Sequence, residues 1–556
     1  MEKILIYQVL PRLFGNLTGR NIPDGTIEQN GCGKMAAFTP QVLGRIKEQG
    51  YTHIWYTGLL EHATKTDYSQ YGIRRDHPAV VKGQAGSPYA IKDYYDIDPD
   101  LAVDVAQRVK EFEALLRRSH KAGLKVIMDF VPNHVARQYA SDAKPARVKD
   151  LGEQDDTTQA FSPMNNFYYI LGQPLRTDFD KGKESIHPYK EYPAKATGND
   201  RFDAHPTATD WYETVKLNYG VDYLNGRTRH FSPTPNTWKK MTDILLFWAR
   251  KGVDGFRCDM AEMVPCEFWH YAIAQVKAKH PEMIFIAEIY NPAAYRDYIT
   301  RGGFDFLYDK VGMYDTLRGI VCNHASAASI TGCWQSVNDI LPHMLYFLEN
   351  HDEQRIASDF YAGDARKAFP ALVTAACLNT NPFMIYAGQE LGEPGMDAEG
   401  FSGLDGRTTI FDYWSPASLR KLYEGSQTFS KEEAETYAYY QRILSLLHSE
   451  EALNQGAFYD LMYVNYDRCC GFNPDRQFAF LRKGEQETLL IVANFDGQEV
   501  NVGVRIPQHA FETLGLRSGT KAAIDLITGE TQTVTLKPDQ HTLVVVPAHG
   551  AVILKF

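Results

Sequence analysis

Short apolar runs recur along most of the chain, and most of them are followed by a segment with helical periodicity. The runs do not alternate between apolar and polar positions, which is typical of strands buried on both faces, as in a parallel sheet covered by helices. There are eight such runs: LIYQVL (5–10), HIWYTG (53–58), LKVIMDFV (124–131), VDGFRC (253–258), MIFIAE (283–288), FDFLYD (304–309), MLYFLE (344–349) and PFMIYAG (382–388). The pattern predicts eight buried strands.

The segments between these runs have the period of amphipathic helices. Residues 104–122 carry an apolar stripe, with Asp104 at the expected start and Gly123 at the expected end. Residues 236–251 repeat the stripe, which ends at Gly252. Eight strands that alternate with helices over this length predict an α/β fold, the (β/α)8 TIM barrel. Periodicity alone does not distinguish this barrel from a doubly wound parallel sheet, so that alternative stays open.

Two regions depart from the strand–helix rhythm. The first, residues 135–212, has no clear strand–helix unit, is rich in Pro, Asp, Tyr and Asn, and is too long for a plain loop. The second, at the end of the chain, has alternating apolar and polar positions separated by turn residues, which is typical of an antiparallel β-sandwich. We therefore predict a catalytic barrel in two parts, residues 1–134 and 213–448. A small inserted domain, residues 135–212, follows the third strand, and a β-sandwich, residues 449–556, ends the chain.

Composition limits the partners of the protein. The formal net charge is −11 and no basic stretch is present, which argues against nucleic acid as a partner. No apolar run is long enough to span a bilayer, and the opening MEKILIYQVL does not resemble a signal peptide. The eight cysteines are scattered apart from Cys469 and Cys470, and their spacing indicates neither a metal site nor a disulfide framework. We expect free thiols and a cytoplasmic protein; the oligomeric state is not predicted.

Four of the apolar runs end in acidic, histidine, asparagine or arginine residues. One such cluster is typical of a capped or solvated strand end. Four of them in barrel order indicate an active site, because active sites of these barrels form at the C-terminal ends of the strands. The clusters are DFVPNH (129–134), GFRCD (255–259), FIAE (285–288) and FLENHD (347–352).

The GFRCD cluster has an informative spacing. Side chains alternate along a strand, so Arg257 and Asp259 are expected on one face and Cys258 on the other. The guanidinium is then expected to keep Asp259 ionised, which suits a nucleophile. Cys258 has no evident base partner, so we expect it to pack toward the helices.

Glu288 ends the next strand, and two carboxylates on adjacent strands can lie near the roughly 5–5.5 Å separation of a retaining glycosidase. Glu288 is expected to begin protonated and to act later as a base. Asp352 and His351 would add a third carboxylate and a hydrogen-bond donor, and His134 another donor. A carboxylate-rich metal site is the alternative interpretation, which Arg257 disfavours because its positive charge opposes cation binding.

In this order, the four clusters resemble the four short motifs of the alpha-amylase family of glycoside hydrolases. IYQVLPRLFGN (6–16) also resembles the first barrel strand of that family, and MIYAGQELG (384–392) resembles the eighth. The resemblance covers about residues 4–445. It implies retaining hydrolysis of α-1,4-glucosidic bonds in malto-oligosaccharides or starch-like α-glucans, with the insert as the B domain and the tail as the C domain.

The resemblance implies a role for each site residue. Asp259 is identified as the nucleophile, Glu288 as the acid/base and Asp352 as the stabiliser of the transition state. GSPYAIKDY (86–94) resembles the loop after the second strand, which makes Tyr89 the platform beneath the reactive glucose. The resemblance also implies three surrounding substrate contacts: His134, Arg257 and His351. Asp129 is expected to hold Arg257 and its own loop and not to touch sugar.

The chain departs from the family pattern at two places. Members that act on long starch chains have Lys–His three and four residues after the nucleophile, where this chain has Glu262 and Met263. If these two line the cleft, the leaving-group side is short and malto-oligosaccharides are preferred; alternatively, both lie on the following helix away from any ligand. Asn133 matches a calcium ligand of many members. The chemistry needs no cofactor, and a structural calcium ion stays open because no further ligands are identified in the insert.

Two other functions are compatible with the same motifs. A transglycosylase or isomerase of the superfamily, acting on maltose, sucrose or trehalose, would use the same three carboxylates. A catalytically inactive relative that only binds carbohydrate is disfavoured, because such proteins lack part of the triad and this chain has all of it together with Arg257.

Overall fold

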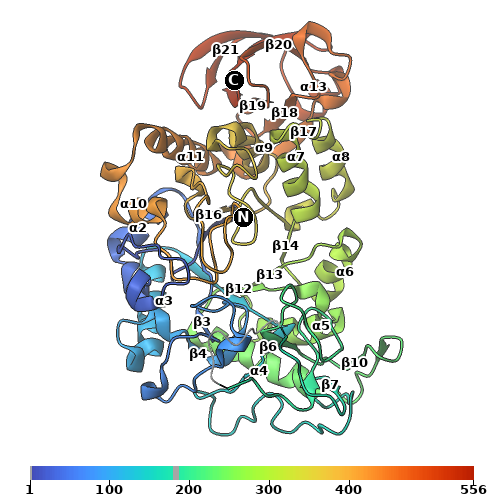
Figure 1. The fold of residues 1–556 in the computed structure, drawn as a ribbon. Coiled ribbons are helices and arrows are strands. Elements are labelled where there is room, and N and C mark those ends of the chain that lie inside the picture. The colour runs from blue at the N-terminus through green and yellow to red at the C-terminus, as the bar shows by residue number, and fades with distance from the viewer. Residues whose placement is uncertain (1–2, 179–186) are drawn as a thin grey trace.

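The computed structural model describes residues 3–178 and 187–556; residues 1–2 and 179–186, which fall in the predicted first barrel part and the predicted insert, lie outside the described residues. Eight parallel strands close into a barrel in the order β1-β16-β15-β14-β13-β12-β5-β2 (Figure 1). Their bounds are β1 (Leu5–Val9), β2 (His53–Tyr56), β5 (Lys125–Phe130), β12 (Gly255–Cys258), β13 (Ile284–Ala287), β14 (Phe306–Tyr308), β15 (Met344–Phe347) and β16 (Phe383–Tyr386). Each strand lies within one of the eight predicted runs. The TIM barrel is therefore confirmed, and the doubly wound sheet is wrong because the sheet closes.

The inside of the barrel is filled by large apolar side chains from seven of its strands: Ile6, Trp55, Ile127, Ile286, Tyr308, Leu345, Phe347 and Met384. The remaining strand, β12, contributes Gly255, where an added Cβ would lie 2.5 Å from Cγ1 of Ile284. Because side chains alternate along β12, Arg257 follows on the same inward side, and its guanidinium lies 5.3 Å from the ring centroid of Trp55. Cys258 packs in the outer core, and burial raises the pKa of its thiol, as expected for a packing residue.

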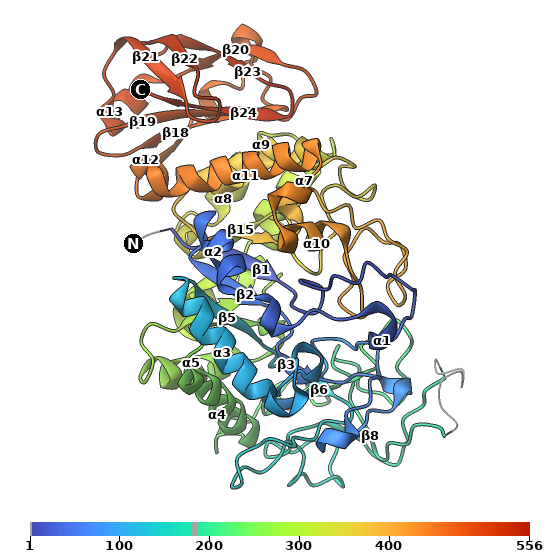
Figure 2. The ribbon, with the colours of Figure 1, turned by 90° about the vertical axis from the view of Figure 1, so that its left-hand side faces the viewer.

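Helices cover the outside of the barrel (Figure 2). The longer ones are α2 (Pro40–Glu48), α3 (Arg108–Lys121), α4 (Asn236–Lys251), α5 (Cys266–Lys277), α7 (Asp315–Val321), α8 (Ser329–Ser336), α9 (Phe369–Cys377), α10 (Ala417–Glu424) and α11 (Lys431–Ser449). Helix α4 has its predicted bounds and ends at Gly252 in a left-handed conformation, φ 102°. Helix α3 begins later than predicted, because Asp104 caps a separate 3-10 turn that precedes it.

Short antiparallel pairs surround the pocket end of the barrel. Strands β3 (Leu60–His62) and β4 (Ile91–Ile97) form a hairpin after β2. In the insert, β6 (His134–Ala136) pairs with β9 (Thr214–Lys216), and β7 (Tyr169–Ile170) with β8 (Ala194–Lys195). Further on, β10 (Val221–Asp222) pairs with β11 (Thr228–Arg229). The small insert is thus present, and its predicted limits stay a prediction.

The chain ends in an antiparallel β domain, which lies at the opposite end of the molecule from the insert (Figures 1 and 2). Its larger sheet has the order β17-β18-β19-β24-β21-β22, and β20 pairs with β23. The bounds are β17 (Ala457–Asp460), β18 (Gln477–Lys483), β19 (Thr488–Asn494), β20 (Val500–Arg505), β21 (Gly519–Asp525), β22 (Thr531–Leu536), β23 (His541–Val546) and β24 (Gly550–Lys555). Among the described residues, no helix is both long and apolar enough to cross a membrane.

Candidate active site

Arg257 lies at the centre of a group of carboxylates at the C-terminal ends of the barrel strands. The parallel register of β12 with β5 places it beside Asp129, with Nη1 3.6 Å from Oδ1. The same Nη1 lies 2.8 Å from Oδ1 of Asp259, and Nη2 lies 2.8 Å from Oε2 of Glu288. Asp352 is more distant, with Oδ2 3.9 Å from Nη2. One fully buried guanidinium therefore hydrogen-bonds Asp259 through Nη1, forms an ion pair with Glu288 through Nη2 and faces two more carboxylates.

Asp259 and Glu288 are both buried and compete for the same cation. Burial and the negative charge of Glu288 raise the pKa of Asp259, and Arg257 opposes that shift without cancelling it. Oε2 of Glu288 accepts a 2.8 Å bond from the Met260 backbone N–H, and Oε1 accepts a 2.5 Å bond from the Tyr290 hydroxyl. The charge of Arg257 acts in the expected direction and favours the ionised form of Asp259, but burial and Glu288 outweigh it, so the net shift of the Asp259 pKa is upward.

The residues that follow the two carboxylates hold the site together. Met260 adopts a left-handed conformation, φ 42° and ψ 44°, which costs backbone energy at a position that aims an N–H at Glu288. Glu262 accepts hydrogen bonds from the backbone N–H groups of Tyr290, at 3.1 Å, and Asn291, at 3.0 Å. Its carboxylate is thus used to fix the loop that carries Tyr290. Sequence reasoning had considered Glu262 as a sugar contact and had not identified Tyr290.

A chain of hydrogen bonds orients Tyr89 behind the carboxylates. The amide nitrogen of Gln8 lies 2.8 Å from Nδ1 of His351, so the imidazole proton sits on Nε2, which lies 2.5 Å from the hydroxyl of Tyr89. That hydroxyl in turn donates to Asp129, at 3.2 Å. Burial lowers the pKa of His351 well below its usual value, and the neighbouring Arg257 adds to this, so the ring is neutral. Asp129 faces Arg257, as expected, and among the described residues its other side-chain contacts are to Tyr89, Trp55 and the Gly58 backbone N–H, not to its own loop.

Asp352 is the most accessible of the four carboxylates, with 37% of its side chain exposed. Its Oδ2 lies 3.2 Å from Nε2 of His351, and its backbone N–H donates to Oδ1 of Asn350, at 2.9 Å. Nε of Arg407 donates to its carbonyl oxygen, at 2.6 Å. These contacts fix the backbone and one side of the carboxylate and leave the other side open to the pocket.

One cavity of about 320 Å³ collects most of the predicted site residues, a volume in the range of small-molecule sites. Five of them line it: Tyr89, His134, Asp259, Glu288 and Asp352. The other two, Arg257 and His351, lie behind the lining and contact it through Asp259, Glu288, Tyr89 and Asp352. The structure therefore brings all seven together, but Arg257 and His351 are buried supports in the free site.

Several lining residues were not predicted. Trp211 lies beside His134 with ring centroids 5.2 Å apart, and Lys82 forms a buried 3.0 Å ion pair with Glu213 across the pocket. Burial lowers the pKa of His134 to about 3, and the charge of Lys216 contributes. The rest of the unpredicted lining consists of Ser87, Thr214, Met260, Tyr290, Ile410 and Phe411. Only the aromatic character of some of these residues could have drawn attention to them, since apart from Thr214 of β9 they come from segments without regular strand or helix periodicity.

The surroundings of Asn133 do not fit a calcium ion. The ammonium of Lys216, from β9, contacts Oδ1 of Asn133, lies 2.6 Å from Oδ1 of Asp200 and donates to the carbonyl of Met263, at 3.3 Å. The amide nitrogen of Asn133 donates to the Gly198 carbonyl, at 2.8 Å. The oxygens that a hard cation would require are thus already grouped around a buried positive charge, which would repel a second cation.

Comparison with known proteins agrees with this architecture. The alpha amylase catalytic domain matches residues 8–456, and the alpha amylase C-terminal all-beta domain matches residues 471–556. A cyclomaltodextrinase from a Bacillus species is 23% identical over 89% of this chain and 73% of its own length. Neopullulanase 2 from Thermoactinomyces vulgaris is 21% identical over 99% of this chain and 77% of its own length.

Solved structures show the same fold. A maltogenic alpha-amylase, AmyB, from Thermotoga neapolitana superposes with a TM-score of 0.63 at 19% identity, covering 100% of this chain and 98% of its own. An alpha-amylase from Geobacillus thermoleovorans, solved in complex with acarbose, gives 0.63 at 18% identity over 100% and 98% of the two chains. At such identities the likeness concerns the fold alone. Together with the two domain matches, it shows that the chain belongs to the alpha-amylase family and is an enzyme of the glycoside hydrolase class.

Proposed function

We propose that this enzyme hydrolyses α-1,4-glucosidic bonds of malto-oligosaccharides with retention of configuration, through a covalent glucosyl ester of Asp259. The observation that supports this most directly is the guanidinium of Arg257, which lies 2.8 Å from both Asp259 and Glu288 at one pocket wall. A retaining hydrolase needs two carboxylates in different protonation states on one cleft. Asp259 and Glu288 share one cation, and we propose that with a glucan bound the pair holds one proton, on Glu288.

In the proposed reaction Glu288 first donates a proton and later takes one back. With a glucan bound, Glu288 carries the proton and donates it to the glycosidic oxygen while a carboxylate oxygen of Asp259 bonds to the anomeric carbon. The bond between the anomeric carbon and the leaving oxygen breaks, and the shortened glucan departs. Glu288 then takes a proton from water, whose oxygen displaces Asp259 from the same carbon. Arg257 stays charged throughout and holds whichever carboxylate is anionic.

The remaining residues are proposed to hold the reactive glucose. The open side of Asp352 and His134 face its hydroxyls, while His351 supports Asp352 and Tyr89 from behind the lining. Tyr89 lies with its ring nearly parallel to that of His351, at 5.2 Å and 23°, and presents an apolar face to the pocket. Acarbose in one similar structure, and the cyclomaltodextrinase and neopullulanase relatives, support an α-glucan substrate.

The preference for short chains rests on a wall at the Tyr89 side of the pocket. The N–H of Ala85 donates to the carbonyl of Phe411, at 3.0 Å, which joins the loop after β2 to the segment after β16. Arg12 joins the same segments, donating to the carbonyls of Ile410, at 2.8 Å, and Gly86, at 3.2 Å. Glu288 marks the leaving-group side of the cleaved bond. The wall therefore limits how many glucose units can lie on the opposite side, the one that becomes attached to Asp259.

Calcium has a structural role in many family members, and we propose that Lys216 takes that role here. Its ammonium joins the end of β5, the insert and the turn after Asp259 through the contacts with Asn133, Asp200 and Met263. Activity is then expected to need no divalent cation.

The products of maltoheptaose test the proposal. We expect the first product, followed by proton NMR, to be the α-anomer, and early products to be dominated by one short sugar. Phe411→Ala, which lowers the wall, should spread the early product lengths, whereas Tyr463→Ala at an exposed aromatic of the C-terminal domain should not. A β-anomer would refute retention. An even spread of product lengths from the unmodified enzyme would refute the wall.

A further inference from the structure

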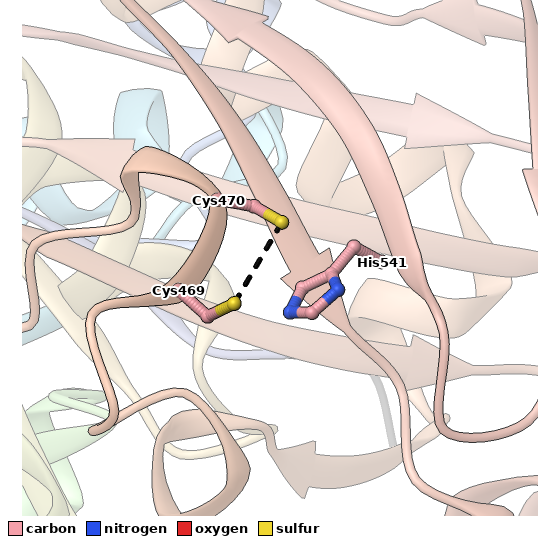
Figure 3. A group of neighbouring side chains, drawn as sticks. All are labelled: Cys469, Cys470 and His541. Carbon is pink, nitrogen blue, oxygen red and sulfur yellow. Dashed lines mark hydrogen bonds between the residues drawn. The ribbon is translucent and has the colours of Figure 1, made fainter.

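Two adjacent cysteines and a histidine form a cluster in the C-terminal β domain. Cys469 and Cys470 lie in the loop before β18, and His541 begins β23, so the sequence does not reveal their proximity. The two sulfur atoms are 3.8 Å apart, and one donor atom from each of the three side chains lies within 4.8 Å of the others. Figure 3 shows both sulfurs on the side of the loop that faces the edge of the imidazole ring.

The loop backbone is bent to bring the two sulfurs together. Consecutive side chains in an extended segment point in opposite directions. Here Arg468 and Cys470 both have left-handed conformations, with φ 57° and 53°, which non-glycine residues adopt at a cost in free energy. Gly503 of β20 leaves room for the arrangement, since a Cβ there would lie 2.6 Å from Cβ of Cys470 and 3.0 Å from Cβ of His541.

The three side chains have atoms available to bind a ligand. Nε2 of His541 is buried and makes no hydrogen bond to any residue that the structure describes. All eight cysteines of the chain lie within the described residues and are free, so both sulfurs are thiols. Arg505 of β20 does not occupy the site, because it is paired with Asp467 at 2.8 Å.

The distances suit a thiophilic ion. A tetrahedral zinc ion with Zn–S bonds of about 2.3 Å separates two sulfur ligands by roughly 3.8 Å. The observed separation of 3.8 Å matches that edge and is far longer than a disulfide bond. Two thiolates and one imidazole are donors typical of Zn²⁺, and a water molecule would complete four-coordination.

We propose that Cys469, Cys470 and His541 form a binding site for a thiophilic divalent cation of the Zn²⁺ class. Binding forms two metal–sulfur bonds and one metal–nitrogen bond and releases the two thiol protons to solvent, with no change of oxidation state. The site belongs to a different domain from the catalytic pocket. Neither its occupation nor its loss is therefore expected to change hydrolysis, and the inference does not depend on the proposed function.

The test is a metal titration of the full-length chain. The protein is first treated with a chelator and a phosphine reductant, freed of chelator, and checked by thiol titration to have both cysteines reduced. Equilibrium dialysis against Zn²⁺ then measures affinity and stoichiometry, and Co²⁺ reports geometry through its visible absorption. We expect one equivalent of Zn²⁺ per chain and a tetrahedral Co²⁺ spectrum with thiolate charge-transfer bands.

Variants separate this site from other thiols and carboxylates. The double variant Cys469→Ser and Cys470→Ser should lose the equivalent and the charge-transfer bands, and His541→Ala should weaken binding at least about tenfold. Cys322→Ser, at a half-buried cysteine elsewhere, is the matched control and should bind as the unmodified chain does. Equal Zn²⁺ binding by the unmodified chain and the double variant would overturn the proposal. Unchanged affinity in His541→Ala would reduce the site to a bare dithiol and refute the three-ligand arrangement.

Discussion

Two buried cations lie at the pocket end of the barrel, and they differ in shape and in partners. Arg257 spreads its charge over a planar fork and holds the carboxylates of Asp259 and Glu288 at 2.8 Å each. Lys216 concentrates its charge on one nitrogen, which is surrounded by an amide oxygen, a carboxylate oxygen and the carbonyl of Met263. The partners of Arg257 are carboxylates of the reaction centre. The partners of Lys216 come from three separate segments of the chain.

We assign different roles to the two cations: Arg257 prepares the carboxylates for the reaction, and Lys216 holds parts of the fold together. A guanidinium does not lose its proton in proteins and offers several donors, so it can stay paired with two carboxylates while one of them gives up and regains a proton in the proposed reaction. An ammonium is compact and can be surrounded by oxygens from several directions, as a metal ion is. We infer that disturbing the first cluster abolishes turnover and spares the fold, and that disturbing the second destabilises the fold.

The largest expected effect is that of Asp259→Asn. A neutral amide beside Arg257 cannot form the glucosyl ester, so kcat on the best substrate should fall by at least about a thousandfold. The fold should persist, because the amide can still accept from Nη1 of Arg257. Steady-state rates and far-ultraviolet circular dichroism measure both effects. Retention of more than about a tenth of the rate would refute the nucleophile assignment.

Glu288→Gln is expected to cripple hydrolysis of natural glucans by about a hundredfold or more. An activated aryl maltoside needs little protonation of its leaving group, so its first step should be spared and a burst of phenol should survive while later turnover slows. Rapid-quench measurement of the burst tests this. Loss of the burst in equal proportion for activated and natural substrates would contradict the acid role.

Lys216→Met tests the second cation. Removing the ammonium leaves Asp200, whose side chain is 26% exposed, and the oxygen of Asn133 without their partner, which should cost about 3 kcal/mol of stability. Lys251→Met is the matched control, because its pair with Glu113 at 2.7 Å is a surface pair. Thermal melts should show a clear loss only for Lys216→Met. A chelator should leave unchanged the melting temperature of the Cys469→Ser, Cys470→Ser double variant, which lacks the proposed Zn²⁺ ligands, and a chelator-induced drop in that variant would contradict the account.

Tyr290→Phe sharpens the picture of the first cluster with a smaller effect. The substitution removes the 2.5 Å hydrogen bond to Oε1 of Glu288 and keeps the ring. A hydrogen bond to a charged group is worth about 1.5–3 kcal/mol, so kcat/KM on maltoheptaose should fall about tenfold or somewhat more. The aryl maltoside should be affected less in its first step. An equal loss for both substrates would mean that Tyr290 positions the sugar and not Glu288.

The smallest expected effect concerns stability and pH. Because the folded-state pKa of Asp259 is raised, the folded protein binds this proton more tightly than the unfolded chain does. The contribution of Asp259 to stability therefore falls as pH rises above about 3.9, the ordinary Asp value. Asp259→Asn should melt at a temperature at least equal to that of the unmodified enzyme, with a gap that widens from acidic to neutral pH. A gap that narrows would place the pKa shift in the opposite direction.

Much of this arrangement could be predicted from the sequence. The barrel strands are continuous apolar runs, and alternation along β12 correctly placed Arg257 and Asp259 on one face and Cys258 on the other. The seven site residues follow strands or resemble family motifs, and they meet at one pocket.

The rest depends on contacts between segments without periodicity. Trp211 comes from an insert whose fold no pattern specifies, Glu213 follows directly after it, and Lys216 reaches Asn133 because β9 pairs with β6. The upward shift of the Asp259 pKa does not follow from the sequence, because spacing reveals the neighbouring Arg257 but neither the depth of burial nor the charge of the nearby Glu288.

Trapping the covalent intermediate tests the central claim most directly. The Glu288→Gln variant is mixed with maltotriosyl fluoride, quenched in acid, digested and analysed by mass spectrometry. Fluoride leaves without protonation, and the second step is slow in this variant, so the ester should accumulate. The account predicts a glycosyl adduct on the peptide that contains Asp259, and its absence when Asp259→Asn is added. An adduct on another residue, or rapid release of fluoride with no adduct and an inverted product, would contradict it.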